Sequence, residues 1–132
     1  LVSAALEAGE VTALKDPTRG GFATALNEMV RKADVGATID ETAVPVREAV
    51  ASAGELLGID PLDVANEGTV ILGVADEDAP AVRDALRDHE RGREAAIIGE
   101  VTDEHRGRIV LDTGFGRRYL SEPEGVQLPR IC

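Results

Sequence analysis

A turn rich in small and charged residues is a candidate site for an anionic group. It directly precedes an amphipathic segment beginning at Phe22, and its sequence is Asp16-Pro17-Thr18-Arg19-Gly20-Gly21. The first N–H groups of a helix lack intrahelical partners, glycines permit close backbone approach, and an arginine adds positive charge. These features suit phosphate binding. The alternative is an ordinary strand-to-helix turn in which Thr18 or Asp16 caps the helix.

A carboxylate at the entrance of a strand is a candidate general base. The sequence Asn66-Glu67-Gly68 comes shortly before the apolar run Val70-Ile71-Leu72. Apolar surroundings would raise the proton affinity of Glu67, which suits a residue that accepts a proton during a reaction. We expect Glu67 to be partly buried and close to the turn at residues 16–21. The alternative is a loop carboxylate bonded to nearby backbone N–H groups, with Gly68 at positive φ.

The one cysteine of the sequence is its last residue. Cys132 follows Pro129, Arg130 and Ile131. A thiol at the end of an extended arm can collect a group from one protein and carry it into a second active site. The adjacent α-carboxylate disfavours the thiolate, so a pocket would have to activate the thiol. The alternative is a terminal cysteine without a role.

The spacing of the apolar residues predicts the elements that position these groups. Helical spacing predicts helices over residues 22–30, over residues 46–57 and from Glu77 onward, with Asp76 as the N-cap of the third. Strands are expected near residues 35–39, 70–72, 97–101, 108–112 and 118–119, with the strand at residues 70–72 in the centre of a sheet. This order favours an α+β fold, a mixed β-sheet packed with helices.

The expected core is aliphatic, because aromatic residues make up only 2% of the sequence. We expect it to contain Leu26, Met29, Val30, Val50, Leu57, Ile71, Leu72, Leu86, Ile98 and Val110. Residues 122–132 contain prolines and glycine without apolar periodicity, so we expect an extended arm after a domain at residues 1–121. The sequence starts at Leu1 within a helical pattern, which suggests a piece of a longer protein.

Charge and cysteine content argue against several classes of partner. The 25 Asp+Glu outnumber the 14 Lys+Arg, which gives a net charge of -11. An acidic surface repels nucleic-acid phosphates and anionic lipid headgroups, so we expect neither nucleic acid nor membrane as a partner. A single cysteine excludes an internal disulfide and fits the cytoplasm. His89 and His105 lack partners at ligand spacing, so we expect no bound metal.

Together, the three segments resemble the HypE family of hydrogenase-maturation proteins. This family is part of the superfamily of aminoimidazole ribonucleotide (AIR) synthase and selenide, water dikinase. The resemblance covers the chain from about Lys15 to Cys132. It rests on the turn at residues 16–21 with Ala25-Leu26-Asn27-Glu28, on Asp60-Pro61-Leu62 with Ala65-Asn66-Glu67-Gly68, and on the terminal Pro-Arg-Ile-Cys. The first two segments are typical of the C-terminal domain of the superfamily, and the terminal cysteine is specific to HypE.

The resemblance implies an AIR synthase-related (PurM-like) C-terminal domain and a defined chemistry. The carbamoyltransferase HypF would place a carboxamide on Cys132. The longer protein would then use ATP and Mg²⁺ to dehydrate it to a thiocyanate, and the HypC–HypD pair would receive the cyano group for nickel–iron hydrogenase. Glu67, between Asn66 and Gly68, would be the base. The residues facing the phosphates would be Asp16, Thr18, Arg19, Gly20 and Gly21.

The resemblance also implies what these 132 residues would lack. Most nucleotide and Mg²⁺ contacts would come from an N-terminal domain, so we expect this chain alone to bind no cofactor tightly and to be inactive. We expect the full-length protein to be a homodimer. Two alternatives stay open. One is another ATP-dependent enzyme of the superfamily in which Cys132 is incidental, and the other is a non-catalytic docking or dimerisation domain.

Overall fold

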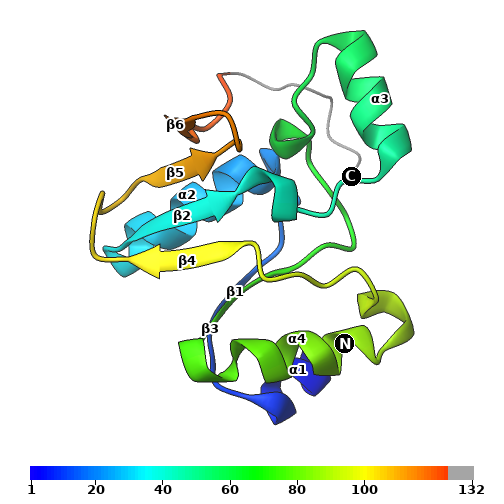
Figure 1. Cartoon of the computed structure of the whole chain (residues 1–132), viewed down its shortest axis with the longest axis vertical. Coiled ribbons are helices and arrows are strands. Elements are labelled where there is room, and N and C mark those ends of the chain that lie inside the picture. Colours follow the sequence, from blue (N-terminus) through cyan, green and yellow to red (C-terminus); the bar gives the residue numbers. More distant parts are fainter. Residues whose placement is uncertain (125–132) are drawn as a thin grey trace.

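The computed structural model describes residues 1–124, which form two β-sheets covered by helices (Figure 1). In chain order the elements are α1 (Val2–Ala8), β1 (Val11–Lys15), α2 (Gly21–Ala33), β2 (Gly36–Asp40), the 3-10 turn η1 (Glu41–Ala43), α3 (Glu48–Leu57), the 3-10 turn η2 (Pro61–Asp63), β3 (Ile71–Val74), the 3-10 turn η3 (Asp76–Asp78), α4 (Ala79–Arg87), the 3-10 turn η4 (Glu90–Gly92), β4 (Gly99–Thr102), β5 (Ile109–Asp112) and β6 (Arg117–Tyr119). The predicted α+β fold with a mixed sheet is confirmed.

The larger sheet has four strands in the order β4-β2-β5-β6. Strands β2 and β5 run parallel at its centre, and the two outer pairs are antiparallel. Helix α2 lies along one face of this sheet (Figure 1). Leu26 and Val30 of α2 pack in one cluster with Ile39, Ile109 and Leu111 of the strands. This cluster is the main core of the domain, and it fixes the start of α2 where the candidate turn lies.

The smaller sheet is an antiparallel ribbon of β1 and β3. Helices α1 and α4 pack together beside it, at the bottom of Figure 1. Their contact buries Ala5, Val82 and Leu86, with Leu72 and Val74 of β3 against the same cluster. The ribbon leads directly into the candidate site, because β1 ends one residue before the turn.

Helix α3 lies apart from both sheets, at the upper right of Figure 1. It contains no buried residue, and the side chains of Val50 and Leu57 are 47% and 67% exposed. Their predicted place in the core is therefore wrong. The physical reason is that α3 rests on η2 rather than on a sheet, so most of its apolar stripe has no neighbour within residues 1–124.

Three further predictions about local structure are wrong. Strand β3 is not central, because it pairs with β1 in a ribbon and belongs to a different sheet from β2 and β5. In β5, Ile109 and Leu111 are buried and Val110 is only partly buried, because alternate residues of a strand face opposite sides. Asp76 does not cap a helix: it lies inside η3, whose N-cap is Ala75.

The rest of the expected core is found in the interior. Leu26, Val30, Ile71 and Leu86 are buried, and Met29, Leu72 and Ile98 are partly buried and pack against the two clusters. Beyond β6, Leu120 is buried, and Glu122 forms an ion pair with Arg31 of α2. The remainder of the expected arm, residues 125–132, lies outside the described residues.

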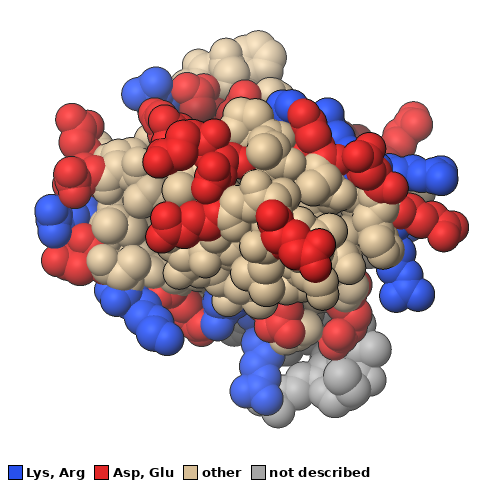
Figure 2. All heavy atoms as spheres, turned by 90° about the horizontal axis from the view of Figure 1, so that it is seen from below, with Lys and Arg blue, Asp and Glu red and all other residues tan. Residues whose placement is uncertain are grey.

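Surface charge follows the acidic composition. Figure 2 shows acidic side chains spread over one face of the molecule, with basic side chains interspersed and no continuous basic area on that face. None of the helices within residues 1–124 is long and apolar enough to cross a membrane.

Candidate phosphate-binding turn and carboxylate loop

The turn at residues 16–21 connects β1 with α2. Gly20 and Gly21 have φ values of 65° and 69°, in the left-handed region that favours glycine. No side chain caps the first turn of α2. The capping alternative for Thr18 or Asp16 is therefore wrong, and the glycines are needed for the backbone conformation.

The two glycines have different surroundings. Gly21 is buried, and a Cβ atom there would lie 2.6 Å from the backbone carbon of Asp63 and 2.7 Å from the carbonyl oxygen of Leu62. Gly21 thus lets η2 pack directly against the start of α2. Gly20 is exposed. The helix start is closed on the side of η2 and open at Gly20, so its N–H groups are only partly available to an anionic ligand.

A hollow of about 370 Å³ lies beside this helix start. Its lining consists of Lys15, Asp16, Thr18, Arg19 and Glu28. The Lys15 ammonium forms an ion pair with the Glu28 carboxylate. Arg19 has no hydrogen bond or ion pair with any residue in the described part of the chain. Its guanidinium is therefore the cation available to an anionic ligand, and the Thr18 hydroxyl adds a donor.

The carboxylate loop lies against this turn. The backbone N–H of Asn66 donates a hydrogen bond of 3.0 Å to the carbonyl oxygen of Pro17. Within the loop, the Thr69 hydroxyl donates to Asn66 Oδ1 at 3.0 Å, and Gly68 has a φ of 81°. The structure thus brings together two segments that lie almost fifty residues apart in the sequence.

The expected partial burial of Glu67 is wrong for the described residues. Glu67 is exposed, as are Asn66, Gly68 and Thr69, because neither sheet extends over this loop. The apolar surroundings that would make Glu67 a stronger base are therefore not supplied by residues 1–124. Any such environment has to come from another part of the protein.

Two residues of the Ala25-to-Glu28 segment connect α2 to other parts of the domain through polar contacts. Asn27 is a buried polar side chain, and its Nδ2 donates to the carbonyl oxygens of Ala23 at 2.9 Å and Leu120 at 2.8 Å. These bonds tie α2 to the chain just after β6. Glu28 holds Lys15 at the end of β1, as described above. This segment therefore positions the site by fixing α2.

Four polar residues near the turn were not predicted as site residues, although Glu28 and Asp60 belong to segments that carry the family resemblance. Lys15 and Glu28 line the hollow, and no spacing rule relates the end of a strand to the second turn of a helix. Asp60 caps η2 by accepting a 2.9 Å hydrogen bond from the N–H of Leu62, which its place before Pro61 could have signalled. Asp63 follows in η2, where partial burial and the nearby Asp60 raise its carboxyl pKa above the usual value, against the lowering effect of Arg118.

The site residues suit one anionic group better than a metal ion. Within the described residues, no group of three or more His, Cys, Asp or Glu side chains comes together to hold a metal. Arg19, Thr18 and the open end of α2 suit a phosphate, although Asp16 and Glu28 share the hollow and limit its positive charge. Cys132 lies outside the described residues.

Comparison with known proteins shows the family to which the chain belongs. The model of the AIR synthase related protein, C-terminal domain, matches residues 1–112. The chain therefore belongs to the AIR synthase-related family, as its C-terminal domain.

Within that family, the chain is similar to HypE proteins. The chain is 50% identical over 135 residues to the carbamoyl dehydratase HypE of Azotobacter vinelandii, covering 100% of this chain and 39% of the relative. It is 43% identical to a crystal structure of the hydrogenase maturation protein HypE in complex with ATP, with a TM-score of 0.88, covering 96% of this chain and 39% of that one. A crystal structure of a HypE–HypF complex matches with 39% identity and a TM-score of 0.86, covering 92% of this chain and 40% of that one. The chain thus spans 39% of the length of its first curated relatives.

Proposed function

We propose that this chain is the C-terminal domain of a carbamoyl dehydratase of the HypE type. In this proposal the longer protein accepts a carbamoyl group on Cys132 and dehydrates it to a thiocyanate with ATP. The observation that carries the proposal is the 50% identity to a carbamoyl dehydratase along the whole chain. The resemblance between the two internal motifs and this family points the same way.

The proposed chemistry uses two residues of this chain directly. The Cys132 sulfur forms a bond to the carbamoyl carbon and loses its proton, while the bond between that carbon and its donor breaks. In the second step the carbon–oxygen bond breaks and both nitrogen protons leave, which converts the thiocarbamate to a thiocyanate. ATP supplies the phosphoryl group that turns the amide oxygen into a better leaving group. Glu67 accepts one nitrogen proton as the carbon–nitrogen triple bond forms.

The turn at residues 16–21 has a supporting role in this proposal. Arg19, the Thr18 hydroxyl and the open helix start at Gly20 face one anionic group, and their fixed positions stabilise charge as it develops on a phosphate. We place most of the nucleotide and Mg²⁺ ligands in the rest of the longer protein. There the loop around Glu67 would also gain the cover that residues 1–124 do not provide.

We further propose a division of the chain and a set of partners. Residues 1–121 form the domain, and residues 122–132 form an arm that carries Cys132. HypF is the proposed carbamoyl donor, a proposal supported by the HypE–HypF complex among the similar structures. The HypC–HypD pair is the proposed acceptor of the cyano group. A homodimer in the cytoplasm completes the proposal, with no nucleic acid or membrane partner.

Intact-mass measurement on the longer protein tests the proposed reaction. After incubation with HypF and carbamoyl phosphate, Cys132 should gain a carboxamide of about 43 Da, and added ATP should remove about 18 Da as water. The variant Cys132→Ser should gain nothing. Modification at another residue, or full activity of that variant, would contradict the proposal and favour a different enzyme or a docking domain.

A second experiment tests the role of Glu67. The variant Glu67→Gln should accept the carbamoyl group on Cys132 normally and fail to lose water, because a base is needed only when protons leave nitrogen. The matched control is Glu77→Gln, which changes an exposed glutamate in η3, on the α4 side of the molecule. Near-normal dehydration by Glu67→Gln would assign the base to another residue.

A further inference from the structure

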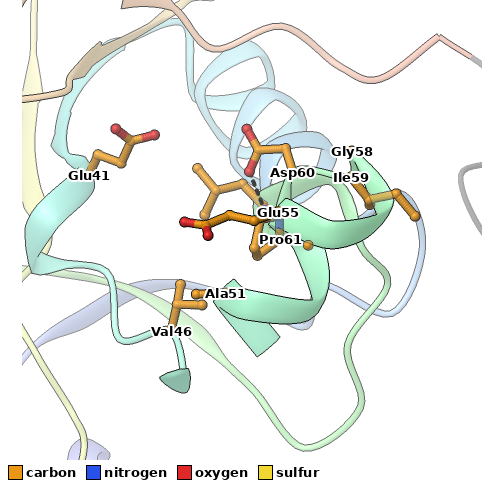
Figure 3. Close-up of a pocket in the computed structure, with 10 residues that line it drawn as sticks. Glu41, Val46, Ala51, Glu55, Gly58, Ile59, Asp60 and Pro61 are labelled. Carbon is orange, nitrogen blue, oxygen red and sulfur yellow. Dashed lines mark hydrogen bonds between the residues drawn. The ribbon is translucent and has the colours of Figure 1, made fainter. Parts of the chain in front are cut away.

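A second hollow lies between η1, α3 and η2. Its volume is about 510 Å³, and Figure 3 shows the residues around it. Apolar groups form much of its lining: Val46, Ala51, Ile59, Pro61 and Leu62. We call it the α3 groove. It is separate from the hollow at Arg19, with which it shares no residue.

The apolar stripe of α3 continues this groove. Val50 and Leu57 lie on the same face of the helix as Gly54, at positions i, i+4 and i+7. Gly54 lies against the segment that follows the helix, because a Cβ atom there would lie 2.7 Å from the carbonyl oxygen of Ile59. Val50 and Leu57 stay 47% and 67% exposed on either side of this contact. The groove and the stripe form one apolar surface that residues 1–124 leave uncovered.

Three carboxylates border this surface. Figure 3 shows Glu41, Glu55 and Asp60 around the groove. The Nη2 atom of Arg118 in β6 lies 3.7 Å from Oε1 of Glu41 and 3.4 Å from Oδ2 of Asp60. Arg118 therefore partly neutralises the charge of these two carboxylates. The side chain of Glu55 has no ion pair or hydrogen bond with a described residue. A segment that complements the surface therefore combines apolar side chains with a positive charge.

Residues 125–132 have this composition. Their sequence is Gly-Val-Gln-Leu-Pro-Arg-Ile-Cys, with apolar residues at positions 126, 128 and 131, a single arginine and no acidic side chain, so the α-carboxylate of Cys132 is their one acidic group. Arg118, on the rim of the groove, precedes the last described residue, Glu124, by six residues, and Glu122 pairs with Arg31 near the end of α2. Eight extended residues span about 26 Å at roughly 3.3 Å each, which is comparable to the width of a small domain.

We propose that residues 125–132 dock in the α3 groove of their own chain when Cys132 is not engaged by a partner or an active site. Leu128 and Ile131 cover the apolar stripe, and Arg130 pairs with Glu55. This deepens the proposed function, on which it rests for the idea that Cys132 travels between sites. Ordering eight residues opposes docking, so the contact is weak and the arm is readily released.

A spin label tests the docking without any substrate. Cys132 is the only cysteine of the chain, so a thiol-specific nitroxide attaches at one position. NMR spectra of the isotopically labelled 132-residue chain are then recorded before and after chemical reduction of the nitroxide. The active nitroxide should selectively weaken the amide signals of α3 and of residues 58–62, compared with the spectrum after its reduction. The variants Glu55→Lys and Leu57→Ser should abolish this loss of signal. Both change exposed side chains, so an otherwise unchanged spectrum confirms that the fold is kept.

The control variant is Glu90→Lys, which makes the same change of charge at an exposed residue of η4 and should leave the loss of signal intact. Signal loss at residues 16–21 and 66–68 instead would overturn the proposal in favour of a resting place at the carboxylate loop. Signal loss that appears only between spin-labelled and isotope-labelled copies would overturn it in favour of a second copy. An absence of selective loss would also overturn it. Since no carbamoyl donor or ATP is present, each result is independent of whether Cys132 accepts a carbamoyl group.

Discussion

Helices α2 and α3 have similar apolar patterns and very different surroundings. In α2, Leu26 and Val30 are 6% and 4% exposed, because this face packs on strands β2 and β5. In α3, Val50 and Leu57 are 47% and 67% exposed, and the helix rests on the short turn η2. An apolar stripe thus predicts a helix and shows which of its faces packs against other parts of a protein. It does not say whether the partner of that side lies in the same piece of chain.

The difference also separates structural residues from residues available for binding. The α2 stripe is fully used in holding the domain together and fixing the candidate turn at its start. The α3 stripe contributes little to the fold of residues 1–124, so its apolar character calls for another explanation. Contact with a further segment or protein is the explanation that agrees with the groove beside it.

The largest expected effect comes from truncating one leucine in each helix. Leu26→Ala should destabilise the chain by about 2–5 kcal/mol, because it leaves a cavity in the main core. Leu57→Ala should change the free energy of unfolding by less than about 0.5 kcal/mol, as is usual for an exposed position. Urea unfolding of the two variants provides both values.

Equal losses for the two leucines would contradict this comparison. Such a result would mean that α3 is covered in solution as thoroughly as α2. Repeating the Leu57→Ala measurement in a chain that ends at residue 124 would then show whether residues 125–132 provide the cover.

A smaller effect is expected from a pair of glycines at the ends of these helices. Gly21, at the start of α2, and Gly58, at the end of α3, have nearly equal φ values of 69° and 68°. Gly21→Ala places a methyl group 2.6 Å from the backbone of Asp63, whereas the same atom at Gly58 meets nothing within 4 Å. Both variants bear a left-handed penalty of about 1–2 kcal/mol. Gly21→Ala should therefore lower the stability of the chain clearly more than Gly58→Ala. Thermal unfolding of the two variants measures this difference.

Similar losses of stability in both glycine variants would show that η2 can shift away from residue 21 at little cost in free energy. The close packing of η2 on the start of α2 would then not be a constraint on the candidate turn. A parallel measurement of anion binding at Arg19 would show whether that movement opens the helix start.

Local patterns predicted many elements of the fold. The periodicity around Leu26 and the alternation before Ile39 each occur where the structure has α2 and β2. The run Ile109-Val110-Leu111 does not alternate, so its buried side could not be inferred until α2 was known to lie over one face. The pairing of β3 with β1 is a contact between distant segments, which an apolar run cannot specify.

The candidate site was predictable only in part, for the same reason. Two glycines before a helix signalled the turn, and the family resemblance linked it to Glu67. The 3.0 Å hydrogen bond from Asn66 to Pro17 that joins them is a tertiary contact without a local signal. The exposure of Glu67 could not be inferred either, because burial depends on what covers the loop.

The smallest expected effect concerns Asp63, in the turn that both helices contact. Partial burial, and next the charge of Asp60, raise its pKa above the ordinary value of 3.8, whereas Arg118 opposes the shift. A raised carboxyl pKa means that the folded state favours the protonated form. This stabilisation is complete below 3.8 and disappears as the pH rises through the folded-state pKa. Asp63→Asn should therefore make the chain more stable at about pH 7, by at most ~1 kcal/mol, with no advantage at about pH 3.

Asp112 provides a control of opposite sign. The backbone N–H of Gly114, and then Arg117, lower its pKa below 3.8, so its stabilising contribution is present above 3.8 and is lost as the pH falls. Asp112→Asn should therefore destabilise the chain near neutral pH, and the two variants should move in opposite directions in the same pH series of thermal unfolding. If Asp63→Asn instead lost stability at neutral pH, the ionised carboxylate would be making a favourable contact. That result would make Asp63 a residue that holds η2 between α2 and α3 by its charge, and the two helices would then share an electrostatic support as well as a packing contact.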